Sequence, residues 1–453
     1  MNEMLRQFSD KVRGKKIAVI GVGISNVPLI KFLLKYGAEI CAYDKKEKEQ
    51  LGAVYGELSQ LGVRFVLGEG YLDDIPENII FKTPGMRIDN PALMKASKRG
   101  AWITSEMEVF FDVCPAKIIA VTGSDGKTTT TTLVNKFLSA GGYKTRLGGN
   151  IGRPLIGEIE EITSDEWVVL ELSSFQLHTM RKSPDIAVIT NITPNHLDWH
   201  TDYNEYIESK KNIMKFQAEN GVVVLNNNNE ETAKLIGDAN GLVRTFSAYR
   251  DADFSVNDGF VVKGTEKLLD ISDIKLPGMH NVENYMTAMA AVYDLVPVSV
   301  FSEVAKTFGG VEHRIELVRT IDGVKYYNSS IDSSPNRSIN TLRVFGDNVV
   351  MIAGGKDKGI PYDEIGPSIV EHVKSLVLIG KTADKIEEAV RNTVGGDKVR
   401  ILHATTYPEA VSLAKDEAVS GDVVILSPAS TSFDMFNNFE ERGNLFKEIV
   451  LNL

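Results

Sequence analysis

The residues with the most evident chemistry follow an apolar run at residues 117–122, where the sequence turns into Gly-Ser-Asp-Gly-Lys-Thr-Thr. Glycines in a strand-to-helix loop let backbone N–H groups point at phosphate oxygens, a following lysine reaches the outer phosphates, and a threonine hydroxyl can ligate Mg²⁺. The full phosphate-binding loop has an earlier glycine, where this chain has Val121. A purely structural turn would not explain the Lys-Thr pair at the helix start. The segment therefore predicts a nucleotide-phosphate site formed by Gly123, Ser124, Asp125, Gly126, Lys127, Thr128 and Thr129.

Two more polar segments follow apolar runs that are typical of buried strands. Glu171 ends the run at residues 167–170, and a loop with His196 and Asp198 follows residues 186–190. Ligands of open α/β sheets collect at the carboxyl ends of the strands. A carboxylate buried there needs a cation or hydrogen-bond donors, and Mg²⁺ beside the nucleotide phosphates is the obvious cation for Glu171. A helix cap or an ion pair is the alternative for Glu171, and a structural role is the alternative for His196.

The amino-terminal segment imitates a dinucleotide-binding loop. Gly21 and Gly23 follow an apolar run at residues 16–20, and Asp44 ends the next run. Asn26 occupies the position of the third glycine of that pattern. A diphosphate site and a tight turn between strand and helix are equally consistent with these residues.

Two loops late in the chain also leave predicted strands. Residues 353–358 and 428–434 each follow an apolar run and carry cations or hydroxyl groups. Together they could bind an anionic second substrate. Arg314 lies close to Gly309 and Gly310, where we expect a hinge, and an arginine there can contact a nucleotide held across a cleft.

Strand-like and helix-like segments alternate along the whole chain, which predicts parallel sheets with helical crossovers. The length of 453 residues is too great for one core and suggests three domains. The irregular stretch at residues 251–274 predicts a small β element within the second of them. We predict an α/β fold with a Rossmann-like amino-terminal domain at residues 1–114, a central parallel-sheet domain of the P-loop ATPase type at residues 115–310 and a Rossmann-like carboxyl-terminal domain at residues 311–453.

The composition argues against several classes of protein. A net charge of −11 disfavours broad nucleic-acid binding, although a local basic pocket can still bind phosphates. The two cysteines, Cys41 and Cys114, suggest no disulfide framework and fit a reducing compartment. The chain has no apolar stretch that is long enough for a membrane span, and its amino terminus has no apolar signal region. We expect a cytoplasmic monomer that binds small molecules and no nucleic acid.

Taken in order, these segments resemble the Mur ligases of peptidoglycan synthesis, and the resemblance covers all three domains. Its motifs here are Gly-Ser-Asp-Gly-Lys-Thr, Glu-Leu-Ser-Ser-Phe-Gln-Leu, Asn-Ile-Thr-Pro-Asn-His-Leu-Asp, His280-Asn281-x-x-Asn284, Glu-His-Arg and the final run from Ser-Pro-Ala to Asn-Phe-Glu-Glu-Arg-Gly. The resemblance implies that the first domain binds a UDP-sugar, the second binds ATP and the third carries an incoming amino acid. It further implies an ATP-dependent ligase that adds D-glutamate to UDP-N-acetylmuramoyl-L-alanine through an acyl phosphate and a tetrahedral intermediate.

The resemblance also implies roles by motif position. Lys127 contacts the phosphates, and Asn150 lies beside the reacting groups. The implied metal ligands are Thr128 and Glu171 for one Mg²⁺, and His196 and a carbamylated Lys210 for a second. The other implied ligand-binding residues are Asn284 and Arg314 for the nucleotide, Ile24, Ser25 and Lys45 for the UDP group, and Ser333, Lys358, Ser432 and Phe439 for glutamate.

The chain departs from the commonest family pattern in one segment. Where that pattern reads Asn-Asp-Ser-Lys-Ala-Thr, residues 328–333 read Asn-Ser-Ser-Ile-Asp-Ser, so an acid is absent at Ser329 and a lysine at Ile331. This leaves open the identity and chirality of the added amino acid. Lys358 or Arg337 could compensate for the missing residues. A ligase of the same architecture for L-glutamate, another amino acid or a folate therefore stays an alternative, as does a nucleotide-binding relative without catalysis.

Overall fold

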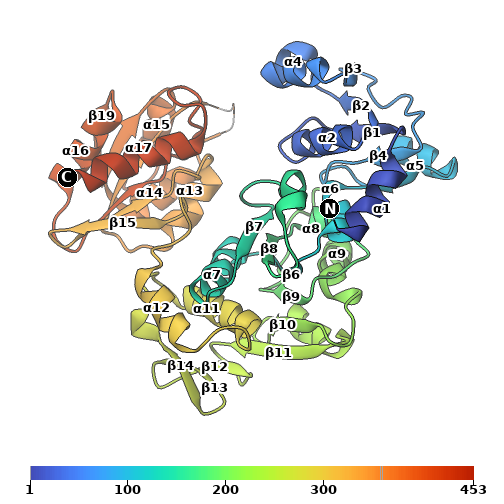
Figure 1. Ribbon diagram of the computed structural model, residues 1–453. Helices are drawn as coiled ribbons and strands as arrows, with labels where there is room; N and C mark the ends of the chain where they lie inside the picture. The colour runs from blue at the N-terminus through green and yellow to red at the C-terminus, as the bar shows by residue number, and fades with distance from the viewer. Residues whose placement is uncertain (1, 358, 360) are drawn as a thin grey trace. The chain divides into compact units, whose positions relative to one another are not determined.

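The computed structural model describes residues 2–357, 359 and 361–453, and the strands among them form three sheets (Figure 1). Each sheet is mostly parallel and is combined with helices from the same part of the chain, which confirms the predicted α/β fold. The domain limits drawn from the sequence stay a prediction. Among the described helices, none combines the length and the hydrophobicity that a membrane crossing requires.

The amino-terminal sheet consists of five parallel strands in the order β3 (Arg64–Leu67), β2 (Glu39–Asp44), β1 (Lys16–Ile20), β4 (Ile79–Phe81) and β5 (Trp102–Thr104). Its helices are α1 (Glu3–Val12), α2 (Asn26–Lys35), α3 (Lys48–Leu51), α4 (Ala53–Gln60), α5 (Pro91–Lys98) and α6 (Glu106–Val113). The chain leaves β1 for β2 on one side and later reaches β4 on the other side. The carboxyl ends of β1 and β4 are therefore where a ligand crevice is expected in such a sheet.

The central sheet has nine strands in the order β14 (Glu266–Asp270), β13 (Phe260–Lys263), β12 (Phe254–Asn257), β11 (Leu242–Ser247), β10 (Val222–Asn226), β9 (Ile186–Ile189), β6 (Lys117–Thr122), β8 (Trp167–Glu171) and β7 (Thr145–Gly149). The strands β12 to β14 pair antiparallel and confirm the predicted small β element. The helices are α7 (Lys127–Ala140), α8 (Ser174–Leu177), α9 (Tyr203–Lys215), α10 (Glu230–Lys234), α11 (Met279–Val292) and α12 (Ser299–Thr307).

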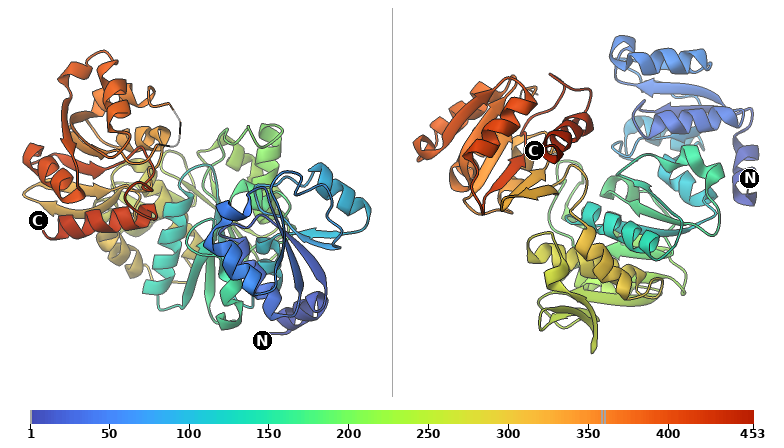
Figure 2. Two further views of the ribbon diagram at one scale, coloured as in Figure 1. Left: turned by 90° about the horizontal axis from the view of Figure 1, so that it is seen from above. Right: turned by 60° about the vertical axis from the view of Figure 1, so that its left-hand side comes forward.

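The strand order of the central sheet explains why separate motifs can meet. β6 lies between β8 and β9, so the segments that follow these three strands leave the sheet side by side. The helix α7, which follows β6, packs against α11 from much later in the chain (Figure 2), with the Phe137 and Tyr285 rings 6.2 Å apart. This packing brings the His280-to-Asn284 motif next to the start of α7.

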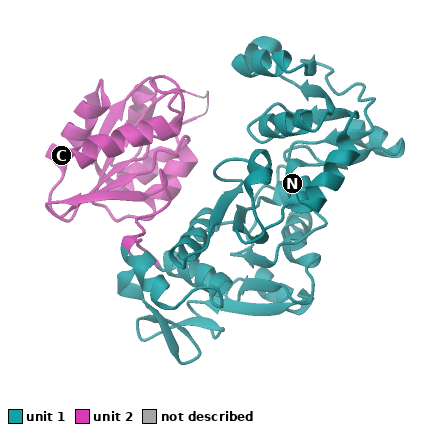
Figure 3. Ribbon diagram, viewed as in Figure 1, with its two compact units in different colours: residues 1–274, 279–306 teal, residues 275–278, 307–453 magenta. Residues whose placement is uncertain are grey.

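The chain divides into two compact units (Figure 3). Residues 1–274 and 279–306 form the first unit, which contains the amino-terminal and central sheets. Residues 275–278 and 307–453 form the second unit, which contains the third sheet.

The third sheet has six strands in the order β15 (Glu316–Ile321), β16 (Val324–Asn328), β20 (Val423–Leu426), β17 (Val349–Ala353), β18 (Val373–Ile379) and β19 (Arg400–Ala404). Its helices are α13 (Pro335–Leu342), α14 (Ile365–His372), α15 (Ala383–Arg391), α16 (Tyr407–Glu417) and α17 (Phe439–Leu451). Along β17, Met351 packs in one apolar cluster and its neighbour Ile352 packs in another. Both faces of this sheet are therefore covered, as expected for parallel strands joined by helices.

Candidate active site

The loop between β6 and α7 requires both of its glycines. Gly123 has a backbone φ of 148°, and a Cβ atom at this position would overlap the Thr190 hydroxyl. Gly126 has a φ of 75°, and a Cβ atom there would overlap the side-chain oxygen of Asn284. The backbone conformation and the close neighbours both exclude larger residues. The structure thus forms the loop that the sequence predicts and places Asn284 against it.

Polar neighbours hold this loop in place. The Ser124 hydroxyl lies 2.8 Å from the Tyr206 hydroxyl and accepts a hydrogen bond from the Thr193 N–H at 2.9 Å. The Asp125 N–H donates to the Asn191 side chain at 2.9 Å. These partners come from the segment after β9 and from α9. The loop is therefore fixed before any ligand arrives, with the amino terminus of α7 directly after it.

Lys127 adds positive charge to the same place. It is the first residue of α7, and its Nζ donates to the Ser124 carbonyl at 2.9 Å. The ammonium group and the positive end of the helix dipole therefore lie on one side of the loop. This combination favours a polyanion such as a nucleotide phosphate.

Thr128, Asn150 and Glu171 form one hydrogen-bonded group. The Glu171 side chain is only 2% exposed, and its carboxylate accepts hydrogen bonds from Thr128 Oγ1 at 2.7 Å and from Asn150 Nδ2 at 2.9 Å. The Asn150 N–H also donates to the Glu171 carbonyl at 2.8 Å. Residues from three separate motifs thus meet at one buried carboxylate. A carboxylate and a hydroxyl beside a phosphate loop are a donor set that suits Mg²⁺.

Lys210 is buried directly beneath the loop. Its side chain lies on α9, is 2% exposed and donates from Nζ to the Gly123 carbonyl at 2.7 Å and to Thr122 Oγ1 at 3.4 Å. Burial lowers the pKa of Lys210 well below its ordinary value, the nearby Lys127 charge lowers it further, and Glu171 opposes the shift. Both acceptors are uncharged oxygens, so the neutral amine is favoured in this position.

His196 lies in the loop after β9, in a left-handed backbone conformation with a φ of 54°. Its ring packs edge-on against Phe175, with the ring centres 4.9 Å apart. Partial burial lowers the pKa of His196, and the charge of Lys127 also lowers it, while Asp198 opposes the shift. A neutral imidazole within electrostatic reach of both lysines is the form that can ligate a metal.

A pocket of about 210 Å³ lies beside the phosphate loop and could accept the nucleoside part of a nucleotide. Asn284 lies in its wall and donates to the Asn281 side chain at 3.2 Å. Phe246 and His280 line the same pocket but were not predicted as site residues from the sequence. Phe246 lies near the end of β11, so its place at the carboxyl end of a strand was a signal that could have found it.

The amino-terminal loop uses Asp44 and Asn26 to hold its own backbone. The Asp44 carboxylate accepts a hydrogen bond from the Val22 N–H at 2.6 Å, and Asn26 Nδ2 donates to the carbonyl of Ile20 at 2.9 Å. Asn26 therefore replaces the third glycine of the dinucleotide pattern with a side chain that ties the loop to the end of β1. The predicted UDP contacts Ile24, Ser25 and Lys45 follow β1 and β2 at the same carboxyl edge, and the Ile24 side chain is 83% exposed.

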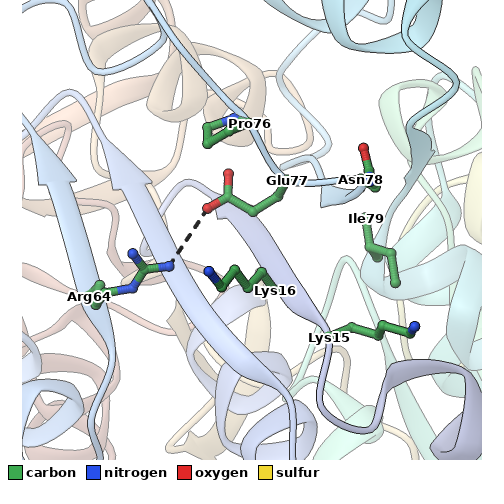
Figure 4. Close-up of a pocket in the computed structure, with 7 residues that line it drawn as sticks. All are labelled: Lys15, Lys16, Arg64, Pro76, Glu77, Asn78 and Ile79. Carbon is green, nitrogen blue, oxygen red and sulfur yellow. Dashed lines mark ion pairs between the residues drawn. The ribbon is translucent and has the colours of Figure 1, made fainter.

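A pocket of about 310 Å³ in the amino-terminal domain lies at the opposite edge of its sheet (Figure 4). Residues at the starts of β1, β3 and β4 line this pocket. Arg64 and Glu77 form an ion pair there, with a distance of 4.0 Å between Nη2 and Oε1. Ligands of parallel sheets bind at the carboxyl edge. This pocket is therefore separate from the predicted UDP site.

The predicted glutamate contacts in the second unit lie on loops that leave its sheet and at the start of α17. Ser432 is buried and follows β20, while Ser333 is half-buried and follows β16. Phe439 is the first residue of α17, and its ring lies 5.9 Å from that of His313. Lys358 lies outside the described residues. Arg314 belongs to the same unit as these residues, whereas Asn284 belongs to the first unit.

The acid that is absent at Ser329 is present three residues later as Asp332. Its side chain is 4% exposed, and its carboxylate accepts a hydrogen bond from the Ser427 hydroxyl at 2.9 Å. Burial raises the pKa of Asp332, while hydrogen bonds from Ser329, Thr341 and Ser427 act in the opposite direction. Ser329 therefore directs its hydroxyl at a carboxylate that this chain carries at a different position of the same loop.

Arg442 joins the two loops of the second unit. Its guanidinium is fully buried, with Nη2 donating to the Ser330 carbonyl at 2.8 Å and Nη1 to the Ser430 carbonyl at 3.0 Å. Nε also donates to the Ser330 hydroxyl at 2.9 Å. A single side chain therefore sets the spacing between the loop after β16 and the loop after β20.

Replacing Arg442 with methionine should destabilise the second unit by about 3 kcal/mol or more, because it leaves two buried carbonyls without their donor. Thermal unfolding of the full chain measures the loss. Arg319→Met is the matched control, because Arg319 is exposed and donates to the Leu451 carbonyl at 2.9 Å. Equal unfolding temperatures for the two variants would contradict the joining role.

Comparison with known families gives a match in each domain. Residues 15–105 match the Mur ligase MurD-like N-terminal domain, residues 121–292 the Mur ligase middle domain and residues 313–430 the Mur ligase glutamate ligase domain. Among solved structures, the UDP-N-acetylmuramate–alanine ligase of Thermotoga maritima aligns over 97% of this chain and 99% of its own, with a TM-score of 0.58 and 18% identity. This likeness shows a shared fold.

Curated relatives are similar over their whole length. The UDP-N-acetylmuramoylalanine–D-glutamate ligase of Ruminiclostridium cellulolyticum is 52% identical over 100% of both chains, and that of Acetivibrio thermocellus is 52% identical over 99% of both. Such identity over the full chain, together with the three domain matches, shows that the chain belongs to the Mur ligase family.

Proposed function

We propose that this protein is an ATP-dependent ligase that joins D-glutamate to UDP-N-acetylmuramoyl-L-alanine in peptidoglycan synthesis and releases ADP and phosphate. Full-length relatives with the name of that activity support the proposal. The observation that carries it is the convergence of Thr128, Asn150 and Glu171 beside the phosphate loop, with Lys210 buried beneath the same loop. ATP and nucleotide sugars are made in the cytoplasm, where we therefore place the reaction.

The proposed reaction has two steps. An oxygen of the alanyl carboxylate attacks the γ-phosphorus of ATP, the bond to the bridging oxygen breaks, and ADP leaves. The amino group of glutamate then attacks the carbonyl carbon of the acyl phosphate. The tetrahedral intermediate loses phosphate and a proton, and an amide remains. Both steps bring anions together, so the site must supply positive charge and oriented donors.

In this proposal the residues around the phosphate loop hold ATP. The backbone N–H groups between Gly123 and Thr129 surround the phosphates, and Lys127 turns from the Ser124 carbonyl toward the γ-phosphate. Thr128 and Glu171 would hold one Mg²⁺, which supplies charge neutralisation for the transferring phosphoryl group. Asn150 keeps the Glu171 carboxylate oriented through its 2.9 Å hydrogen bond.

Lys210 is suited to become a carbamate. The burial that lowers the pKa of Lys210 favours the neutral amine, whose nitrogen can form a bond to the carbon of CO₂ and lose a proton. The product is an anion, which fits a place next to the cationic Lys127 better than a second ammonium group does. Together with the neutral imidazole of His196, that anion would hold a second Mg²⁺.

The second unit would carry the amino acid. Ser333, Ser432 and Phe439 surround the ends of its strands, and Lys358 follows β17 in the sequence. Asp332 places a carboxylate in the loop where the commonest family pattern has its acid at position 329, and here this carboxylate is buried and accepts a hydrogen bond from Ser427.

The choice of amino acid is a direct test. Purified protein with ATP, Mg²⁺ and UDP-N-acetylmuramoyl-L-alanine should release phosphate with D-glutamate, and the rate with L-glutamate should be lower by about a hundredfold or more, because a site built for one arrangement of charged groups leaves them unpaired with its mirror image. Mass spectrometry of the products identifies the amide. Faster turnover with L-glutamate or with a folate substrate would contradict the proposal, and so would the absence of phosphate release with every acceptor.

A further inference from the structure

Within the first unit, a turn of the amino-terminal domain is bound to the segment that leads from His196 to Lys210. The turn follows β4, at the carboxyl edge of the sheet, and ends at Arg87. The Arg87 guanidinium makes a bidentate pair with Glu205, with Nη1 to Oε2 at 2.8 Å and Nη2 to Oε1 at 2.9 Å. Nη1 also donates to the Trp199 carbonyl at 2.9 Å.

Trp199 connects the same turn to His196. Its indole N–H donates to the Gly85 carbonyl at 2.8 Å, and its ring lies 5.1 Å from the Arg87 guanidinium carbon. The Trp199 ring packs on Phe175 at 4.7 Å, and Phe175 packs on His196 at 4.9 Å. An unbroken series of contacts therefore runs from the turn after β4 to the imidazole of His196.

Glu205 connects the turn to the phosphate loop through α9. It lies in the first turn of this helix, where its N–H donates to the capping residue Asp202 at 2.8 Å. The next residue, Tyr206, touches the loop residue Ser124, and Lys210 follows on the same helix. Arg87 holds the pKa of Glu205 well below its usual range, so Glu205 is ionised and paired at neutral pH.

The pair is not an ordinary surface ion pair. Both side chains are 22% exposed, and Arg87 also contacts Asp89 and the Trp199 backbone. Bidentate pairs of this kind are the stronger and more directional ones. Arg87 and Glu205 are 118 positions apart in the chain, so the pair fixes one domain on the other.

We propose that Arg87 is a positioning residue, which locks the turn at the carboxyl edge of the amino-terminal sheet onto the segment that carries His196 and Lys210. This rests on the proposed function, in which that edge binds the nucleotide sugar. The Arg87–Glu205 pair thereby sets the distance between the bound alanyl carboxylate and the phosphate loop. In the proposed function the phosphate loop of the central domain and Arg314 hold ATP, so loss of the Arg87–Glu205 pair should affect ATP binding little.

The test compares Arg87→Ala with Arg64→Ala, which removes an arginine of the same sheet at its opposite edge. Arg87→Ala should raise KM for UDP-N-acetylmuramoyl-L-alanine by about tenfold or more, because binding must then order two segments that the Arg87–Glu205 pair already holds together in the free protein. KM for ATP should stay within about twofold of wild type in both variants. Calorimetric titration of the nucleotide sugar without ATP should show the same weakening for Arg87→Ala and none for Arg64→Ala.

Two further variants separate positioning from simple stabilisation. Arg87→Lys keeps the positive charge but cannot make the bidentate contact, so its KM for the nucleotide sugar should lie between those of wild type and Arg87→Ala. Arg87→Ala and Glu205→Gln both remove the Arg87–Glu205 pair, so their effects on KM should be less than additive when they are combined. Each side chain also has contacts of its own, since Arg87 donates to Asp89 and Glu205 accepts a hydrogen bond from the Thr201 N–H at 2.8 Å. Should Arg87→Ala fail to fold, Arg87→Lys and Glu205→Gln carry the same comparison.

The inference fails if wild type is an active ligase and Arg87→Ala keeps its KM for the nucleotide sugar. It also fails if KM for both substrates rises equally. An inactive wild type would instead overturn the proposed function itself. The calorimetric titration of the nucleotide sugar then tests the role of Arg87 by itself, because unchanged binding by Arg87→Ala would overturn that role.

Discussion

Replacing Lys127 with alanine should lower kcat for phosphate release by a factor of about 10²–10³, because it removes one charge that stabilises the transferring phosphoryl group. The expected loss corresponds to about 3 kcal/mol of transition-state stabilisation. The basis is the position of the Lys127 ammonium group over the phosphate loop, where it donates to the Ser124 carbonyl. The measurement is steady-state phosphate release at saturating ATP, nucleotide sugar and D-glutamate.

Lys136→Ala is the matched control for this prediction. Lys136 is exposed on the same helix, α7, nine residues after Lys127. Its replacement should leave kcat close to that of wild type, which separates the charge at the loop from any effect on the helix. Turnover by Lys127→Ala at the rate of Lys136→Ala would show that the phosphate role is wrongly assigned.

Replacing Lys210 with alanine should reduce kcat by about a hundredfold or more, because the anion that would hold a second metal ion is lost. A short carboxylic acid such as formate or acetate should restore part of the activity, since the substitution leaves space beneath the Gly123 carbonyl where a free carboxylate can take the place of the carbamate. Wild type should not respond to the added acid. It should instead lose activity when CO₂ and bicarbonate are removed from the buffer.

The neighbour Lys211 provides the control for Lys210. Lys211 forms an ion pair with Asp238 at 2.7 Å, so its pKa is raised and its amine stays protonated. Lys211→Ala should therefore keep its activity and show no response to carboxylic acids. The carbamate would be ruled out by full activity in Lys210→Ala without any added acid.

The phosphate loop could be predicted from the sequence because its requirements are local. The left-handed or otherwise unusual backbone at Gly123 and Gly126 needs glycine wherever the loop occurs. The apolar run before the loop reflects the burial of β6 on both faces. Each requirement therefore leaves a local mark in the sequence, a glycine in one case and an apolar run in the other.

Strands at sheet edges were the main elements that the sequence did not predict. β3, β5 and β15 are end strands of their sheets, and apart from Thr104 their residues are exposed or half-buried. These segments become strands because a neighbouring strand offers hydrogen bonds, and that neighbour is far away in the sequence. Hydrophobic patterning is therefore a weaker signal for strands whose residues are exposed or half-buried.

The sequence by itself determined the order of the motifs, the glycines of the phosphate loop and the absence of an acid at Ser329. Only the tertiary structure decided that Lys210 is buried while Lys211 is paired at the surface, and that Asp332 meets the Ser329 hydroxyl. The pairing of Arg87 with Glu205 was likewise decided by the fold. The physical reason is that burial and contacts between distant segments depend on strand order and on the packing of whole helices, which no local pattern of residues encodes.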